Sequence, residues 1–269
     1  MFNDEQKLFQ RLAPHLQRVL VVDAQPASVK LLQELLRTIS TGQMWHAPTD
    51  AKAMQAVQMI DPQLIFVEHS GPGLDGARLA RAIRRSDFPC RKAPIIMVTG
   101  EATAQTILGA RDAGVHEFLR KPFTMKDLLR RLEAVALKPR DWVEAVQYVG
   151  PDRRRFNSAE YQGPRKRKTD ARMTPDQARL LQALKIVRAA AGSLDDDWMQ
   201  ARRALATQAL ELQKAGVAVG DMKLVEAAAA MARLLPTEGS PDKSGLRVAI
   251  GALLTFMPKE EEAAAARAA

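Results

Sequence analysis

Two acidic residues stand at the ends of short apolar runs in the first half of the sequence. Asp23 ends a run that begins at Arg18, and Glu68 ends the run Leu64–Val67 and precedes a turn rich in glycine and proline. Such runs are typical of buried parallel strands. In open α/β sheets, chemistry takes place at the carboxyl ends of the strands. We therefore expect a polar site at this edge of the sheet.

The elements that position these carboxylates alternate along residues 18–137. Runs of strand character are separated by amphipathic stretches whose apolar residues recur every three or four positions. The predicted strands are 18–23, 44–47, 64–68, 94–99 and 115–119, and the predicted helices are 26–41, 50–60, 76–85, 104–113 and 124–137. This alternation predicts a parallel sheet with helices on both faces, an α/β fold.

Residues at or near the ends of the predicted strands form a specific combination over residues 18–137. Its members are Asp23, Glu68, Thr99, Lys121 in Lys121-Pro122-Phe123, Asp112-Ala113-Gly114 and Phe118-Leu119. This stretch resembles the receiver domains of response regulators, the CheY-like family. The resemblance implies a flavodoxin-like, doubly wound sheet of five strands in the order 2-1-3-4-5. It also implies a role in bacterial two-component (phosphorelay) signal transduction.

The resemblance further implies a role for each strand-end residue. Glu68 takes the place of the phosphoacceptor aspartate, and Asp23 belongs to the acidic pocket beside it. Thr99 takes the place of the hydroxyl that contacts the phosphoryl group, and Lys121 that of the lysine that pairs with it. Phe118 matches the aromatic residue that rotates inward in active family members; an ordinary core residue is the alternative.

Two departures from the family pattern bear on activity. Receivers carry two acids after the first strand, whereas this chain has Asp23-Ala24. Mg²⁺ needs several oxygen ligands at short distance, so a metal site made of Asp23 and Glu68 is predicted to be weak or absent. Glu68 replaces the usual aspartate and carries its charge further from the backbone. Because phosphoryl transfer depends on the placement of the acceptor oxygen, Glu68 is predicted to be a poor acceptor.

These departures predict a pseudo-receiver that acts by protein–protein interaction with little or no phosphotransfer. Glu68 could accept a hydrogen bond from the Thr99 hydroxyl and form an ion pair with Lys121. The carboxylate would then imitate the phosphorylated state. Alternatively, Glu68 is an inert relic in a rigid scaffold. A phosphorylation-competent response regulator is a further alternative. No other catalytic motif is present, so no enzymatic activity is expected.

Composition restricts the class of protein. The chain has 269 residues, 46% of them apolar, which suffices for two small domains. A single cysteine, Cys90, excludes a disulfide within the chain. No apolar run approaches the roughly 18–20 residues of a membrane span, and no signal peptide is indicated. A cytoplasmic protein without membrane insertion is therefore expected.

Charge is concentrated after the receiver-like stretch. The formal net charge is +9, and residues 138–172 hold ten Lys or Arg against five Asp or Glu, a net of +5. These residues lack hydrophobic periodicity and are predicted to form a basic, largely disordered linker. Its basic clusters could contact anions or nucleic acid, and a solvated linker is the alternative. The clusters are Arg153, Arg154, Arg155 and Arg165, Lys166, Arg167, Lys168.

The regions on either side of the receiver-like stretch and its linker are predicted to be helical. Residues 1–17 form an N-terminal extension that packs on the body or on a partner. Residues 173–258 predict a small helical bundle, whose last helix, 246–257, is apolar on most sides and is expected at its centre or at a dimer interface. Residues 259–269 form a tail. The absence of histidine after His116 excludes a histidine phosphotransfer bundle.

The expected partners are proteins. A histidine kinase or another signalling protein is the first candidate, and a homodimer the second. A nucleic-acid-associated regulator using the basic linker is a weaker alternative, because the predicted third helix of the bundle has only Lys223 and Arg233 as basic residues. Beyond a weakened Mg²⁺ site, no cofactor is implied.

Overall fold

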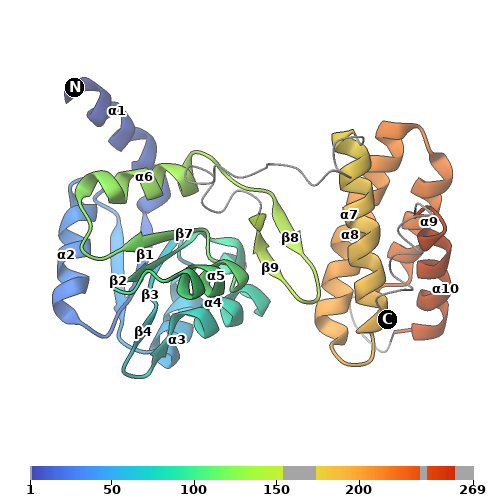
Figure 1. Cartoon of the computed structure of the whole chain (residues 1–269), viewed down its shortest axis with the longest axis horizontal. Helices are drawn as coiled ribbons and strands as arrows, with labels where there is room; N and C mark the ends of the chain where they lie inside the picture. The colour runs from blue at the N-terminus through green and yellow to red at the C-terminus, as the bar shows by residue number, and fades with distance from the viewer. Residues whose placement is uncertain (1, 154–173, 237–240, 258–269) are drawn as a thin grey trace. The chain divides into compact units, whose positions relative to one another are not determined.

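The computed structural model describes residues 2–153, 174–236 and 241–257 (Figure 1). The chain divides into two compact units. The first runs to Val143 and resumes at Tyr148, and the second comprises Glu144–Gln147 with the helical second half. Among the described residues, no helix is both long enough and apolar enough to cross a bilayer.

A five-stranded parallel sheet forms the centre of the first unit. Its strands are β1 (Arg18–Val22), β2 (Gln43–Ala47), β3 (Leu64–Glu68), β6 (Ile95–Thr99) and β7 (Glu117–Arg120). They lie in the order β2-β1-β3-β6-β7. The short strands β4 (Ser70–Gly71) and β5 (Leu74–Asp75) pair separately with each other, so the predicted order 2-1-3-4-5 is confirmed.

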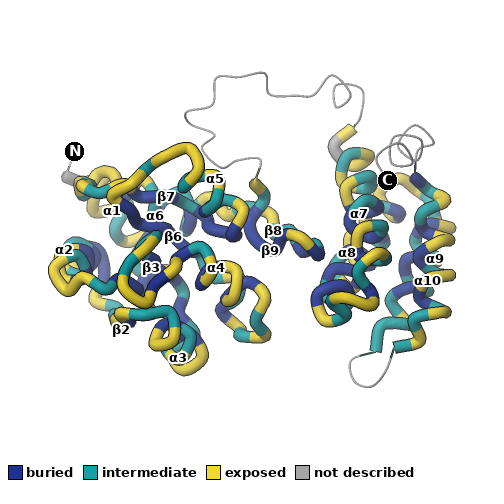
Figure 2. The backbone as a smooth tube through the Cα atoms, turned by 60° about the horizontal axis from the view of Figure 1, so that its bottom comes forward, coloured by how far each residue is buried: buried dark blue, intermediate teal, exposed yellow. Residues whose placement is uncertain are grey.

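Helices cover both faces of this sheet and divide its core into two layers. Alternate residues of β3 point to opposite faces, and Ile65 lies in one layer while Phe66 lies in the other. The Ile65 layer includes Val57 of one helix and Leu79 of the next, and the Phe66 layer includes Leu128. Strands β1, β3 and β6 are buried along almost their whole length, whereas the edge strand β2 is buried only at Ala47 (Figure 2). The five helices are α2 (Pro26–Arg37), α3 (Asp50–Ile60), α4 (Gly76–Arg85), α5 (Ala104–Asp112) and α6 (Met125–Ala136).

The N-terminal extension packs on the first unit. It consists of α1 (Phe2–Leu12) and the 3₁₀ helix η1 (Ala13–Leu16). Leu12 and Leu16 are completely or almost completely buried in the same apolar layer as Leu132 of α6. The extension is therefore part of the core of this unit.

Residues 142–151 differ from the predicted linker. Strands β8 (Trp142–Glu144) and β9 (Val149–Pro151) pair with each other. The Tyr148 hydroxyl donates to the Pro151 carbonyl at 2.6 Å, and Gly114, with a left-handed φ of 83°, leaves room for the Val149 carbonyl. The apolar residues here are too few to show a period, which is why the sequence pattern did not reveal the hairpin.

The second unit contains four long helices, α7 (Pro175–Gly192), α8 (Trp198–Val219), α9 (Met222–Arg233) and α10 (Lys243–Leu254). Of the two places expected for the last helix, the centre of the bundle is wrong, and a dimer interface stays a prediction. Helix α8 packs against both α7 and α9, whereas α10 is buried along one stripe and leaves Val248 73% exposed. The small residues Ala201, Ala204 and Gly216 on α8 permit this close packing from two sides.

Helix α8 also carries apolar side chains on its exposed side. Met199, Leu210 and Val217 are 49%, 59% and 66% exposed, and Ala206 is exposed as well. At about 100° per residue, these four positions fall within an arc of about 40°. We call these four residues the α8 seam.

Candidate functional site

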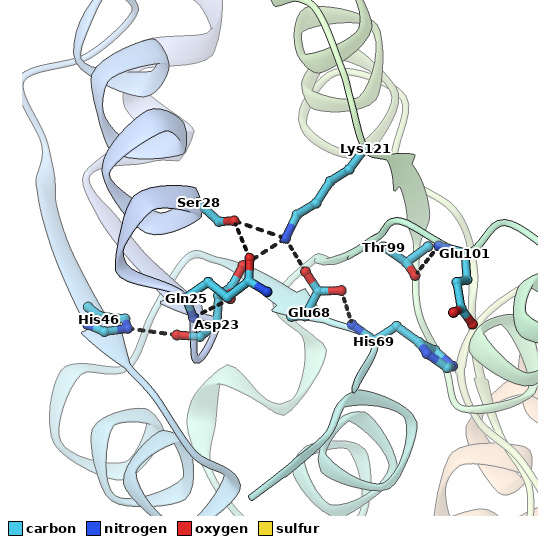
Figure 3. A network of polar contacts seen from close by, with 9 residues as sticks. All are labelled: Asp23, Gln25, Ser28, His46, Glu68, His69, Thr99, Glu101 and Lys121. Carbon is cyan, nitrogen blue, oxygen red and sulfur yellow. Dashed lines mark hydrogen bonds and ion pairs between the residues drawn. The ribbon is translucent and has the colours of Figure 1, made fainter. Parts of the chain in front are cut away.

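The sheet topology brings the four strand-end residues to one edge. Asp23 follows β1, Glu68 ends β3, Thr99 ends β6 and Lys121 follows β7. The strands are in parallel register, with Val22 beside Val67, Glu68 beside Val98 and Thr99 beside Arg120. Parallel strands expose their carboxyl ends on the same side, so side chains from distant parts of the sequence converge (Figure 3).

The ammonium group of Lys121 lies between two carboxylates. Its Nζ is 2.9 Å from Asp23 Oδ2, makes a close ion pair with Glu68 Oε2, and lies 3.3 Å from the Ser28 hydroxyl. The side chains of Asp23, Glu68 and Lys121 are 8%, 13% and 25% exposed. We call Asp23, Ser28, Glu68 and Lys121 the carboxylate–lysine cluster.

Backbone groups hold the second oxygen of each carboxylate. Asp23 Oδ1 accepts from the Gln25 N–H at 2.8 Å, and Glu68 Oε1 accepts from the His69 N–H at 3.2 Å. His46 Nε2 lies 2.8 Å from the backbone oxygen of Asp23. Each carboxylate thus has one oxygen on a backbone N–H and the other on Lys121, which fixes the direction in which both side chains point.

Electrostatics favour the charged form of Lys121. Burial of the ammonium by itself lowers its pKa, but the hydrogen bonds and charges of Glu68 and Asp23 outweigh this, so the pKa of Lys121 is raised. Burial raises the pKa of the Glu68 carboxyl, and Lys121 opposes that rise. The cluster is held together by charge at the edge of the sheet.

Comparison with known proteins agrees with this geometry. The family model described as the response regulator receiver domain matches residues 19–133. Residues 19–133 form a receiver domain. The order of the strands and the position of the cluster at their carboxyl ends are those expected of it. The remaining residues of the chain lie outside that match.

Bacterial proteins of two-component signalling are similar to this receiver domain. The chemotaxis protein CheY-3 of Vibrio cholerae is 27% identical over 118 residues, which are 44% of this chain and 90% of that protein. CheY of Pseudomonas aeruginosa is 28% identical over 44% of this chain and 94% of its own. The transcriptional regulatory protein BaeR of Escherichia coli is 30% identical over 44% of this chain and 47% of its own.

Solved structures of response regulators are also similar to this part of the chain. The structure of CheY4 from Vibrio cholerae is 22% identical and covers 45% of this chain and 98% of its own, with a TM-score of 0.42.

Thr99 and Phe118 of the receiver domain are both buried. Thr99 is 3% exposed, and its hydroxyl oxygen accepts from the Glu101 N–H at 3.0 Å. The expected hydrogen bond from Thr99 to Glu68 does not form in the structure. Lys121 and the His69 N–H engage the Glu68 oxygens instead. Phe118 is 7% exposed and lies in the apolar layer that includes Met97, its neighbour across the sheet.

A divalent cation does not fit the cluster as it stands. Ala24 supplies no oxygen from its side chain, and among the described residues no three His, Cys, Asp or Glu side chains are grouped as metal ligands. One oxygen of each carboxylate, Asp23 Oδ2 and Glu68 Oε2, already faces the Lys121 ammonium. Mg²⁺ requires near-octahedral oxygen coordination, so the residues present disagree with the metal site of the family.

Sequence reasoning missed Ser28, Gln25 and His46 in this site. Ser28 lies in the first turn of α2, soon after the strand that ends before Asp23. Its closeness in sequence to Asp23 is the feature from which its place in the site could have been predicted.

Of the basic candidates after the receiver domain, only Arg153 falls within the described residues. Its guanidinium lies 4.5 Å from the centre of the Tyr148 ring and makes a 2.9 Å ion pair with Asp112. These contacts neutralise Arg153 within its own unit and do not favour a role in binding anions. The other candidates lie outside the described residues, namely Arg154, Arg155, Arg165, Lys166, Arg167 and Lys168.

Proposed function

We propose that this protein is a two-component-type signalling protein whose receiver domain acts as a pseudo-receiver, by protein interaction and with little or no phosphotransfer. The observation that supports this most strongly is the state of Glu68. It stands at the phosphoacceptor position, and both of its oxygens are already occupied, one by the His69 N–H and one by Lys121.

The chemistry of phosphoryl transfer explains why this matters. The acceptor oxygen must face the donor phosphorus in line, while positive charge stabilises the transferring group. Glu68 is one methylene longer than the usual aspartate, and its oxygens point along the sheet edge toward Lys121 and the His69 N–H (Figure 3). Attack on a phosphoryl donor would first require the Glu68–Lys121 ion pair to open.

The interaction face is proposed to be the surface made by α5, β7 and α6. Receiver domains act through other signalling proteins, and here this surface adjoins the buried Phe118 and the strand that leads to Lys121. Leu108 of α5, one of the elements of this face, is 48% exposed. A histidine kinase or another signalling protein would recognise a conformation that the ion pair keeps fixed.

The helical unit is proposed to join two copies of the chain through the α8 seam. The seam is symmetric about Gln208, so antiparallel pairing of two α8 helices places Met199 beside Val217 and Ala206 beside Leu210 of a second copy. Each contact then joins a larger side chain to a smaller one. Self-complementarity of this kind is what a twofold interface requires.

Phosphorylation with acetyl phosphate and Mg²⁺ tests the proposal. Mobility on a phosphate-binding gel is compared for the wild type, for Glu68→Asp and for the double variant Glu68→Asp, Ala24→Asp. We expect no shift for the wild type and a shifted band for the double variant, because it regains both the acceptor and the second acid. A stoichiometric shift of the wild type would show a phosphorylation-competent regulator instead.

A further inference from the structure

The Lys121 ammonium is surrounded by oxygen atoms in the manner of a bound cation. A lysine side chain has three N–H donors and no acceptor. Three side-chain oxygens lie around Nζ, namely Asp23 Oδ2 at 2.9 Å, Glu68 Oε2 in close contact and Ser28 Oγ at 3.3 Å. The number of oxygens equals the number of donors, so the ammonium is fully coordinated by the cluster.

The charge of the site is also nearly balanced without a metal. Asp23 and Glu68 bring two negative charges, Lys121 brings one positive charge, and Ala24 brings none. The remaining oxygens, Asp23 Oδ1 and Glu68 Oε1, are held by the backbone N–H groups of Gln25 and His69. A divalent cation would therefore have to displace the ammonium, because no pair of free carboxylate oxygens is left for it.

We propose that Lys121 is the resident cation of this site and takes the place of the divalent metal that receiver domains use. This inference rests on the proposed pseudo-receiver function and extends it. The cation is covalently attached, so its occupancy does not depend on the Mg²⁺ concentration. The receiver domain is consequently kept in one charge state in the presence and in the absence of Mg²⁺.

The inference predicts a gain of metal binding when the ammonium is removed. In Lys121→Met, a side chain of similar length loses its charge, and Asp23, Glu68 and Ser28 are left as three oxygen donors facing one position. Oxygen donors of this kind bind Mn²⁺ as well as Mg²⁺. The variant should therefore acquire a divalent site that the wild type lacks.

Titration with Mn²⁺, followed by the electron paramagnetic resonance signal of the free ion, measures this directly on the full chain. The matched control is Lys30→Met, which makes the same change at an exposed lysine of α2. We expect one Mn²⁺ per chain to bind Lys121→Met roughly tenfold or more tightly than it binds either the wild type or Lys30→Met. Adding Glu68→Gln to Lys121→Met should abolish the gain and so assign it to this cluster.

Two results would overturn the inference. One is saturable binding of Mn²⁺ to the wild type with the affinity of Lys121→Met, and the other is no gain in a Lys121→Met protein whose circular dichroism is unchanged. Lys121→Gln provides a second folded variant with the same expectation.

The gel assay on the same samples separates this inference from the proposed function. A wild type that binds Mn²⁺ but takes no phosphoryl group would refute the resident cation and leave the pseudo-receiver intact. A phosphorylated wild type would refute the pseudo-receiver.

Discussion

Lys121 and Glu68 form an ion pair across the end of an intervening strand. They are 53 residues apart in sequence, and β3 and β7 are separated in the sheet by β6. The same ammonium also contacts Asp23 beyond β1. A single flexible side chain thus connects the ends of strands on both sides of the sheet centre.

Separating this ion pair should destabilise the first unit. Removing one partner leaves the other charge partly buried and uncompensated. We expect Lys121→Met and Glu68→Gln each to lower the free energy of unfolding, and the double variant to lower it by less than their sum, with a coupling of about 1–3 kcal/mol. Urea denaturation of the four proteins measures this coupling. The pair Lys138–Glu133, whose side chains are 68% and 38% exposed, is the control and should show a smaller one; equal couplings for the two pairs would contradict the account.

His116 should make the first unit less stable in mild acid. Burial, and then the charges of Arg84 and Arg140, hold its pKa well below the usual range, and its Nδ1 lies 3.0 Å from Arg84 Nη2. The unfolded chain binds a proton below about pH 6.5, whereas the folded chain does not, so stability is lost as the pH falls. We expect a loss of about 1 kcal/mol between pH 6.5 and 5.5.

Urea midpoints at the two pH values measure this loss. In His116→Gln the loss should disappear, whereas exposed His15→Gln should keep it. A wild type whose midpoint is the same at both pH values would show that His116 is protonated in the folded state.

Cys90 should be unreactive in the folded protein. Its side chain is 5% exposed, and burial raises the pKa of its thiol to about 11. Because the thiolate is the reactive form, both effects slow attack on a disulfide reagent. Reaction with Ellman's reagent at pH 7.5 should be slow in buffer and fast in denaturant. Fast reaction in buffer would show instead that the Cys90 thiol is accessible in the folded protein.

Two glycines of the first unit should respond to alanine in opposite directions. Gly114 has a left-handed φ of 83° and faces the Val149 carbonyl, so Gly114→Ala should destabilise by at least about 1–2 kcal/mol. Gly109 lies within α5 with no atom near an added methyl group, so Gly109→Ala should stabilise by about 0.5–1 kcal/mol. Thermal unfolding of both variants measures the contrast; a neutral Gly114→Ala would argue that β9 does not pack there.

The α8 seam should make self-association depend on protein concentration. Its residues are apolar and exposed, so pairing of two copies removes apolar surface from water. Sedimentation velocity should therefore show a dimer that forms as the protein concentration is raised. Leu210→Ser should be monomeric, whereas Val248→Ser, at a more exposed position of α10, should not change association. A monomeric wild type would refute this interface.

The strand ends could be predicted from sequence because the apolar runs are short and end on polar residues. That rule placed Asp23, Glu68, Thr99 and Lys121 together, since parallel strands end at one edge. It could not choose among the contacts available to Glu68. The ammonium of Lys121 competes successfully with the Thr99 hydroxyl because it carries a full positive charge, so the attraction of opposite charges adds to its hydrogen bond with the carboxylate.

Features that depend on tertiary contacts were less visible in the sequence. The hairpin of β8 and β9 has too few residues for a period, and its packing involves Trp142 beside Arg84, with 5.4 Å between the guanidinium carbon and the ring centre. The last helix was expected at the centre of the bundle because of its composition. Helix α8 takes that place because its small residues allow two neighbours to approach.

The most direct test of the central claim is titration of the wild type with beryllofluoride and Mg²⁺, followed by the backbone amide resonances of His69 and Lys121. Beryllofluoride mimics a phosphoryl group and needs both an open acceptor and a divalent cation. The account predicts no saturable shift in the wild type and a saturable shift in the double variant Glu68→Asp, Ala24→Asp. A saturable shift of these amides in the wild type would contradict it.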